Sequence, residues 1–225
     1  ERIMNDSGFV TLTRLAASEI TGQDGKAGII EKYFSLSQTD TTCLKDIGLY
    51  PEEMRVGDDI LCLHTLSDVE DLPGKVGTDC RFEKLSTDRS DCRLSFAAPV
   101  GVLLSCNHVY NQFIFIDDHA ENLKNFEQTA RNMQSLSRYS RANQVNKEWI
   151  DEYLNEAHSK GLVSVRCHCN VMAWSDDRDE LKRIRNDVGS QLALMECKPR
   201  HNTTDTPTLF WAGIPGNQAD FPAEE

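Results

Sequence analysis

The stretch from Leu162 to Asn217 decides the fold of this chain. It opens with LVSVRCHCNVMAW (residues 162–174), in which alternate residues are apolar, the period expected of a β-strand. Asp177 then offers a helix cap. Apolar residues follow at helical spacing: Leu181, Ile184, Val188, Leu192 and Met195. A second apolar run, PTLFWAGI (207–214), is interpreted as a strand, so the stretch predicts a βαβ unit with a parallel pair of strands beneath its helix.

The rest of the chain supplies further strands and two more helices. Runs of strand-forming residues predict strands at 9–15, 60–66, 92–97, 100–106 and 109–116, and either a strand or a short helix at 29–36. A short helix is expected at 40–48. Asp118 is expected to cap a helix, and a second helix, from about Asn146, ends at Gly161. Both faces of 109–116 are apolar toward its end, which predicts a central strand covered on both sides.

These elements predict an α+β protein, with mixed sheets and helices packed on them. We expect a strand-rich submodule at residues 1–91 and a second submodule at 92–225 of order β-β-αα-β-α-β. Residues 67–91 are rich in Asp, Glu, Gly and Ser. Such a polar segment buries little apolar surface, so we expect an exposed, mobile excursion or a long hairpin there.

Composition restricts the possible functions. The formal net charge of −12 disfavours direct nucleic-acid binding by this segment. No apolar run approaches the ~18–20 residues of a membrane span. The eight cysteines show no compact disulfide framework, which indicates a reducing, cytosolic compartment. The absence of an initial Met suggests a segment of a longer chain.

One cluster of residues has the chemistry of a zinc site. Cys167, Cys169, Cys197 and His201 are four potential ligands. The predicted geometry disfavours the site, because a helix returning along its strand would leave Cys197 roughly 16–23 Å from Cys167 and Cys169 at ~3.3 Å per residue. We therefore interpret these cysteines as core residues, expect no metal or other cofactor in this segment and assign no catalytic residue.

A phosphate-binding loop is missing from the sequence. The pattern GxxxxGK[ST] places Ser or Thr after Lys to hold magnesium. The two Gly-Lys pairs, Gly25-Lys26 and Gly74-Lys75, are followed by Ala27 and Val76. This segment is therefore not expected to hydrolyse ATP by itself.

Several long runs are shared with one family of proteins. They are EKYFSLSQTDTTCLKDI, RLSFAAPVGVLLSCNHVYNQFIFIDD, NMQSLSRYS, VNKEWIDEYLNEAHSKGLVSVRCHCNVMAW, NDVGSQLALMECKPRHNT and TLFWAGIPGN. Together they resemble the TraG family of conjugation ATPases from Bacteroides-type conjugative transposons, which belongs with the VirB/TrbE/CagE class of type IV secretion ATPases. In that class an α+β region precedes a P-loop motor domain, and the junction commonly carries a turn like Pro215, Gly216 and Asn217.

The resemblance implies a non-catalytic assembly region of a conjugative-transfer ATPase. It implies a cytoplasmic location, peripheral at the inner membrane, and three kinds of partner: its own motor domain, further copies of the chain, and inner-membrane components of the transfer apparatus. ATP and magnesium would act in the motor downstream. Two alternatives stay open: a stand-alone enzyme with a Cys/His zinc site, and a regulatory ligand-binding α+β domain. We expect residues 67–91 to take part in docking.

Overall fold

The computed structural model describes residues 2–8, 11–36, 45–66, 69–74 and 76–221. The α-helices in this part of the chain are α1 (Arg2–Asp6), α2 (Ala17–Thr21), α3 (Ile29–Ser35), α4 (His119–Leu136), α5 (Arg141–Lys160), α6 (Arg178–Leu194) and α7 (Thr206–Ala212). Shorter helical turns are η1 (Val69–Asp71), η2 (Glu83–Leu85), η3 (Pro99–Leu103) and η4 (Gln218–Asp220). The strands are β1 (Ile47–Tyr50), β2 (Glu53–Val56), β3 (Asp59–Leu66), β4 (Cys80–Arg81), β5 (Arg93–Leu94), β6 (His108–Phe115), β7 (Arg166–Ser175) and β8 (Arg200–Asn202).

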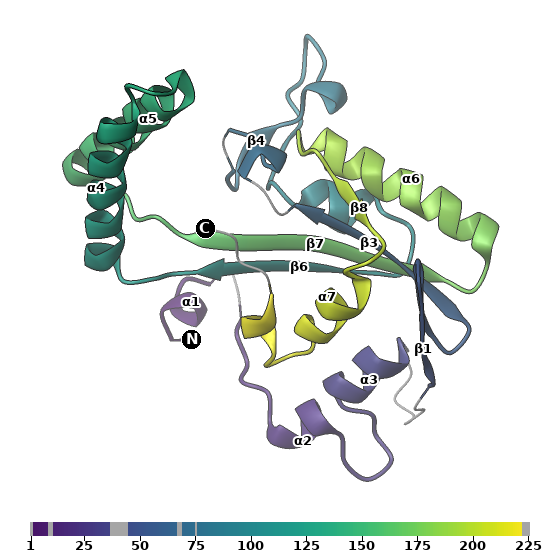
Figure 1. The fold of residues 1–225 in the computed structure, drawn as a ribbon. Helices are drawn as coiled ribbons and strands as arrows, with labels where there is room; N and C mark the ends of the chain where they lie inside the picture. The colour runs from purple at the N-terminus through teal and green to yellow at the C-terminus, as the bar shows by residue number, and fades with distance from the viewer. Residues whose placement is uncertain (1, 9–10, 37–44, 67–68, 75, 222–225) are drawn as a thin grey trace. The chain divides into compact units, whose positions relative to one another are not determined.

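The main sheet has the order β1-β2-β3-β7-β6, with β8 pairing β3 outside this path. The paired strands β1–β2, β2–β3, β3–β7 and β3–β8 are all antiparallel. Helices pack on this sheet, so the predicted α+β class is confirmed (Figure 1).

The predicted parallel pair is wrong. β7 and β8 run in the same direction, but both pair antiparallel with β3, which lies between them. The predicted strand at 207–214 is also wrong, because that run forms α7, with Pro207 in its first turn. A proline is favoured there, since the first turn of a helix needs no backbone N–H from it.

One face of the sheet packs against α6. The predicted apolar residues of this helix are all buried, and Val188 and Leu192 have no exposed surface. They form one core with strand residues such as Val171 and Ala173. The helical period of the sequence therefore identified the buried side of α6.

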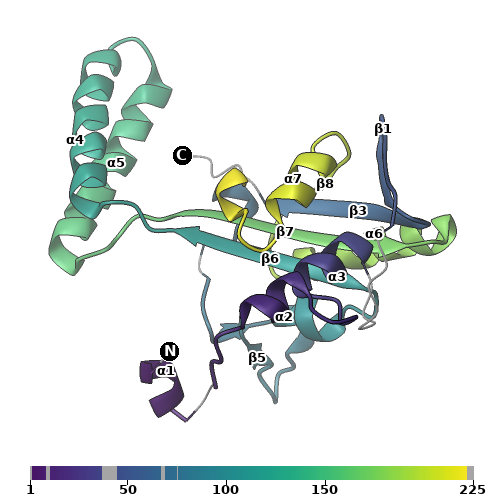
Figure 2. The same cartoon turned by 90° about the horizontal axis from the view of Figure 1, so that it is seen from below.

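The other face carries α7 and α3 (Figures 1 and 2). Phe210 of α7 is fully buried, and its ring contacts those of Tyr33 and Phe34 of α3. The Tyr33 hydroxyl also donates a hydrogen bond to the Phe210 carbonyl, with an O–O distance of 2.7 Å. Of the two alternatives for 29–36, the helix is the one observed.

Several other segments differ from expectation. β1 and β2 were not predicted. The predicted strand at 100–106 contains the helical turn η3, and only Arg93–Leu94 is strand within 92–97. In the described sheet β6 is an outer strand rather than a central one, and Ile114 is exposed. Residues 11–15 form no regular element, and residues 9–10 and 40–44 of the predictions lie outside the described part. The helix predicted at 40–48 is wrong at its described end, because Ile47 and Gly48 begin β1.

The chain divides into two compact units. Unit 1 comprises Glu1–Asn111 and Cys169–Pro222, and unit 2 comprises Gln112–His168 with the last three residues. This division differs from the predicted boundary at residue 91, which falls inside unit 1. Both units share β6 and β7, since each strand begins in one unit and ends in the other.

Unit 2 contains an antiparallel helical hairpin. The Asp118 carboxylate caps α4 as predicted, accepting a hydrogen bond from the backbone N–H of Glu121 at 2.9 Å. Gly161 ends α5 in the left-handed conformation that the sequence predicted for it (φ 65°). The helix begins at Arg141, earlier than expected. Trp149, in its first half, is 66% exposed.

None of the described helices has the length and apolar composition needed to cross a bilayer. The seven described cysteines, all but Cys43, are free thiols.

Candidate functional site

The structure separates the four predicted zinc ligands into different surroundings. Cys169 and Cys197 belong to the buried core under α6. His201, on β8, instead faces His64 of β3, and their ring centroids are 5.3 Å apart. Cys167 is half-buried in β7. Within the described residues, no group of three His, Cys, Asp or Glu side chains is placed to hold a metal ion.

The predicted separation of Cys169 from Cys197 is wrong. The two thiols belong to the same buried cluster. Burial first, and then the neighbouring Cys169, raise the pKa of the Cys197 thiol to about 12. The 17 residues of α6 span about 26 Å at 1.5 Å per residue. Six strand residues before the end of β7 span about 20 Å, so this helix is long enough to return the chain to the level of Cys169.

A polar cluster that the sequence did not reveal lies on the α6 face of β3. Cys62 and His64 are two residues apart and point to the same side, with 3.8 Å between Cys62 Sγ and His64 Nδ1. His201 and Arg185 complete the cluster. The spacing of Cys62 and His64 is visible in the sequence, but their partners on β8 and α6 are more than a hundred residues away.

The surroundings of Cys62 and His64 favour the uncharged form of both side chains. Burial, the His201 ring and the Arg185 charge together lower the pKa of His64 to about 4. Burial raises the pKa of the Cys62 thiol, and Arg185 offsets this only in part. At neutral pH the pair is therefore a thiol beside a neutral imidazole rather than the thiolate and imidazolium of a nucleophilic cysteine.

The described residues 69–74 and 76–91 are attached to the core, and β4 among them pairs with β5 in a hairpin, one of the two forms expected. β4 and β5 pair antiparallel, and Phe82 is buried in the core under α6. Asp71 is only 3% exposed, and its carboxylate forms an ion pair with Arg200, with 3.0 Å between Asp71 Oδ2 and Arg200 Nε. These anchors fix the base of the segment.

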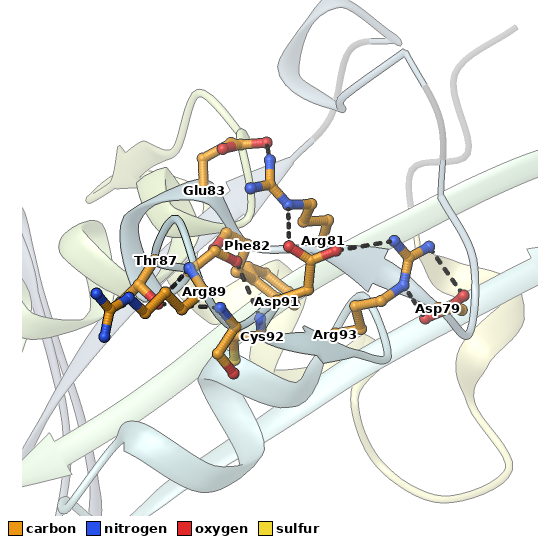
Figure 3. Close-up of polar contacts among 11 residues, drawn as sticks. Asp79, Arg81, Phe82, Glu83, Thr87, Arg89, Asp91, Cys92 and Arg93 are labelled. Carbon is orange, nitrogen blue, oxygen red and sulfur yellow. Dashed lines mark hydrogen bonds and ion pairs between the residues drawn. The ribbon is translucent and has the colours of Figure 1, made fainter.

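The outer surface of this hairpin is a network of ion pairs (Figure 3). Arg93 donates two hydrogen bonds to Asp79, at 2.8 and 2.9 Å. Arg81 pairs with Asp91 at 2.9 Å and also with Glu83. Both arginines are thus occupied within the hairpin. Exposed ion pairs of this kind contribute little to the free energy of unfolding. The main effect of the network is that these two arginines are already paired and are not offered to a binding partner.

A surface hollow of about 630 Å³ lies along α2 and α3. Its lining includes the charged side chains of Glu19, Asp24, Lys26 and Lys32. Small-molecule sites are usually enclosed and mostly apolar, so this charged hollow gives the ligand-binding alternative little support.

Unit 2 exposes an apolar strip where β6 ends and β7 begins. The Asp117 carboxylate accepts two hydrogen bonds from Arg166, at 2.8 and 3.1 Å, and the Arg166 guanidinium lies over the Phe115 ring. These side chains therefore share one face of the strand pair. Ile114 alternates with Phe115 along β6 and is 57% exposed. Ile116, directly after β6, and Val165, directly before β7, are 76% and 47% exposed. We call these three residues, together with the exposed Leu162 and Val163, the apolar strip.

The predicted junction residues form a turn after α7. Gly216 adopts a positive φ of 100°. The Asn217 side chain donates hydrogen bonds to the Trp211 carbonyl at 3.0 Å and to the Asp220 carboxylate at 2.8 Å. These bonds fix the direction of the chain after α7, while a role at a domain junction stays a prediction.

Comparison of the chain with models of known protein families gives no match, and comparison with curated proteins gives none either.

Proposed function

We propose that this chain is a non-catalytic assembly region of a conjugative-transfer ATPase of the type IV secretion class. Its part in DNA transfer between bacteria is docking rather than chemistry. The proposed partners are its own motor domain, further copies of the chain and inner-membrane components of the transfer apparatus, at the cytoplasmic side of that membrane. ATP and magnesium act in the motor, downstream of this segment. The sequence runs that resemble this class are the origin of the proposal.

The apolar strip of unit 2 is the observation that supports docking. Exposed apolar side chains that lie together mark interaction surfaces more often than single ones do. Ile114, Ile116 and Val165 are large and exposed, and the neighbouring charges of Asp117 and Arg166 are paired with each other. Burying one such side chain stabilises a complex by about 1.5–3 kcal/mol.

The continuation of the gene tests the motor assignment. We expect the coding DNA beyond the Glu225 codon to encode GxxxxGK[ST] at the start of a helix within roughly a few hundred residues. A stop codon directly after Glu225 would overturn the assignment.

A double substitution tests the docking surface. Ile116→Ser with Val165→Ser, made in the full-length protein, should lower the frequency of conjugative transfer at least about tenfold, because two buried contacts are lost. The control is Leu49→Ser with Val102→Ser, which changes exposed apolar side chains of unit 1 outside residues 67–91. Circular dichroism verifies folding of both proteins. Equal transfer by the two variants would contradict a docking role for the apolar strip.

A further inference from the structure

The connection between α4 and α5 carries a local excess of positive charge. Residues 128–147 contain four of the 24 basic residues of the chain and none of its 36 acidic residues. The basic residues are Arg131, Arg138, Arg141 and Lys147. The remaining sequence holds 20 basic and 36 acidic residues. This part of unit 2 is therefore cationic within a strongly anionic chain.

Two of these four cations are available to an external ligand. Arg131 pairs with Glu127 at 3.4 Å, and Lys147 pairs with Asp151 at 2.5 Å. Within the described residues, Arg138 and Arg141 form no ion pair, and both are exposed. Their charges lie on either side of Tyr139, at the point where the helical hairpin reverses direction.

Exposed amphipathic rings accompany the charges. Tyr139 is 85% exposed and Trp149, in α5, is 66% exposed. Leu136, at the end of α4, is also exposed. Tyr and Trp are enriched where protein meets the headgroup layer of a membrane, because their rings have an apolar body and a polar edge. We call Leu136–Arg141, with Arg131, Lys147 and Trp149, the basic tip.

We propose that the basic tip docks on an anionic lipid surface, with Arg138 and Arg141 on lipid phosphates and Tyr139 among the headgroups. The inference rests on the charge and exposure of unit 2 and not on the proposed function. Juxtamembrane basic residues each contribute about a fivefold gain in affinity for anionic lipid. The rest of the chain, with 20 basic and 36 acidic residues, is repelled by the same surface, which favours approach by this end of unit 2.

The shape of the tip favours a lipid surface over a nucleic acid. Binders of single strands combine a cationic groove that follows the backbone with aromatic side chains on which bases stack. Two antiparallel helices joined by the four residues 137–140 present a convex end instead. A convex cationic end meets a broad anionic surface without needing a groove.

Co-sedimentation of the 225-residue chain with vesicles tests the proposal. We expect binding to vesicles of phosphatidylcholine mixed with phosphatidylglycerol, a decrease as salt is raised, and no binding to phosphatidylcholine alone. Arg138→Glu with Arg141→Glu should weaken binding at least about tenfold. The matched control is Lys182→Glu with Arg183→Glu, an equal charge change on the exposed surface of α6. Tryptophan fluorescence should shift to the blue on binding, and Trp149→Phe should remove that shift.

Four results would overturn the proposal. One is equal binding to anionic and neutral vesicles, and another is equal loss of binding in the tip variant and the control. A third is binding of a single-stranded or duplex oligonucleotide that the tip variant loses while vesicle binding is unchanged. The fourth is self-association of the chain, without vesicles, that depends on Arg138 and Arg141 while vesicle binding does not. Circular dichroism of each variant separates loss of binding from loss of fold.

Discussion

At the scale of single residues, His64 links folding to pH. Its pKa is about 4 in the folded protein, mainly because the ring is buried, whereas an unfolded histidine has the ordinary value of 6.5. Between these values the unfolded chain binds a proton that the folded chain does not. The contribution of neutral His64 to the free energy of unfolding is therefore fully present above pH 6.5. It is lost as pH decreases toward 4, which lowers that free energy by roughly 3 kcal/mol.

His64→Leu should flatten this part of the pH profile. The measurement is the free energy of unfolding from urea titrations at several pH values between 4 and 7, and the difference in slope between variant and parent isolates the contribution of His64. His158→Gln, which changes an exposed imidazole of unit 2, is the control. The explanation fails if the slopes of parent and His64→Leu are the same.

The thiols provide a second prediction at this scale. Cys62 is 1% exposed, and burial raises its pKa, so the folded protein offers neither access nor thiolate at this position. Iodoacetamide at pH 8 should label Cys62 at least about a hundredfold more slowly than the half-buried Cys92, since labelling of Cys62 requires an opening of the fold. Peptide mapping by mass spectrometry measures both rates, and both should be similar in urea. Equal rates in the folded protein would contradict the burial of Cys62.

Residue patterns in the sequence revealed little of the candidate sites. The alternation of β3 places Cys62 and His64 on one face, but nothing in it indicates that His201 of β8 lies opposite His64. The apolar strip was hidden for a similar reason. Ile114 and Val165 are in apolar runs that predict burial, and their exposure depends on which strands flank β6 and β7.

At the scale of secondary structure elements, Asp177 should determine how well α6 begins. Its carboxylate accepts a hydrogen bond from the backbone N–H of Asp179 at 2.9 Å. Asp177→Ala removes this cap and should lower the free energy of unfolding by about 1 kcal/mol. Asp176→Ala is the matched control, because it removes an exposed neighbouring carboxylate that does not cap the helix. Chemical denaturation measures both, and an equal effect of the two substitutions would contradict the capping role.

Long amphipathic elements were predicted from the sequence, as was β3, whereas β1, β2 and α7 were not. The apolar period of α6 and the caps at Asp118 and Gly161 are local signals, and local contacts are what a sequence pattern records. The run that forms α7 is only seven residues long and mostly apolar, so its period cannot distinguish a buried helix from a strand. The pairing of β3 with β7 joins residues about a hundred positions apart, which no local pattern specifies.

At the scale of the whole molecule, buried apolar surface is distributed unevenly between the units. The helical hairpin of unit 2 buries only two apolar side chains among its described residues, Ala130 and Ala157. Unit 1 buries a large core on both faces of its sheet, including Leu63, Met172 and Phe210. Since burial of apolar surface supplies most of the stabilisation, the two units should open with different free energies.

Hydrogen exchange of the parent chain and of Leu192→Ala tests this difference. In the parent, amides of α4 and α5 should exchange well before those of β3, because local opening of a sparsely packed hairpin is easier than opening of the core. Leu192 has no exposed surface, so Leu192→Ala should reduce the protection of the slowest amides in unit 1 by about 2–5 kcal/mol. The same substitution should leave the protection of α4 and α5 unchanged. Val102→Ala, at an exposed position of unit 1, is the control. If α4 and β3 lose protection together in Leu192→Ala, the two units open as one, and the uneven distribution of the core does not determine how this protein unfolds.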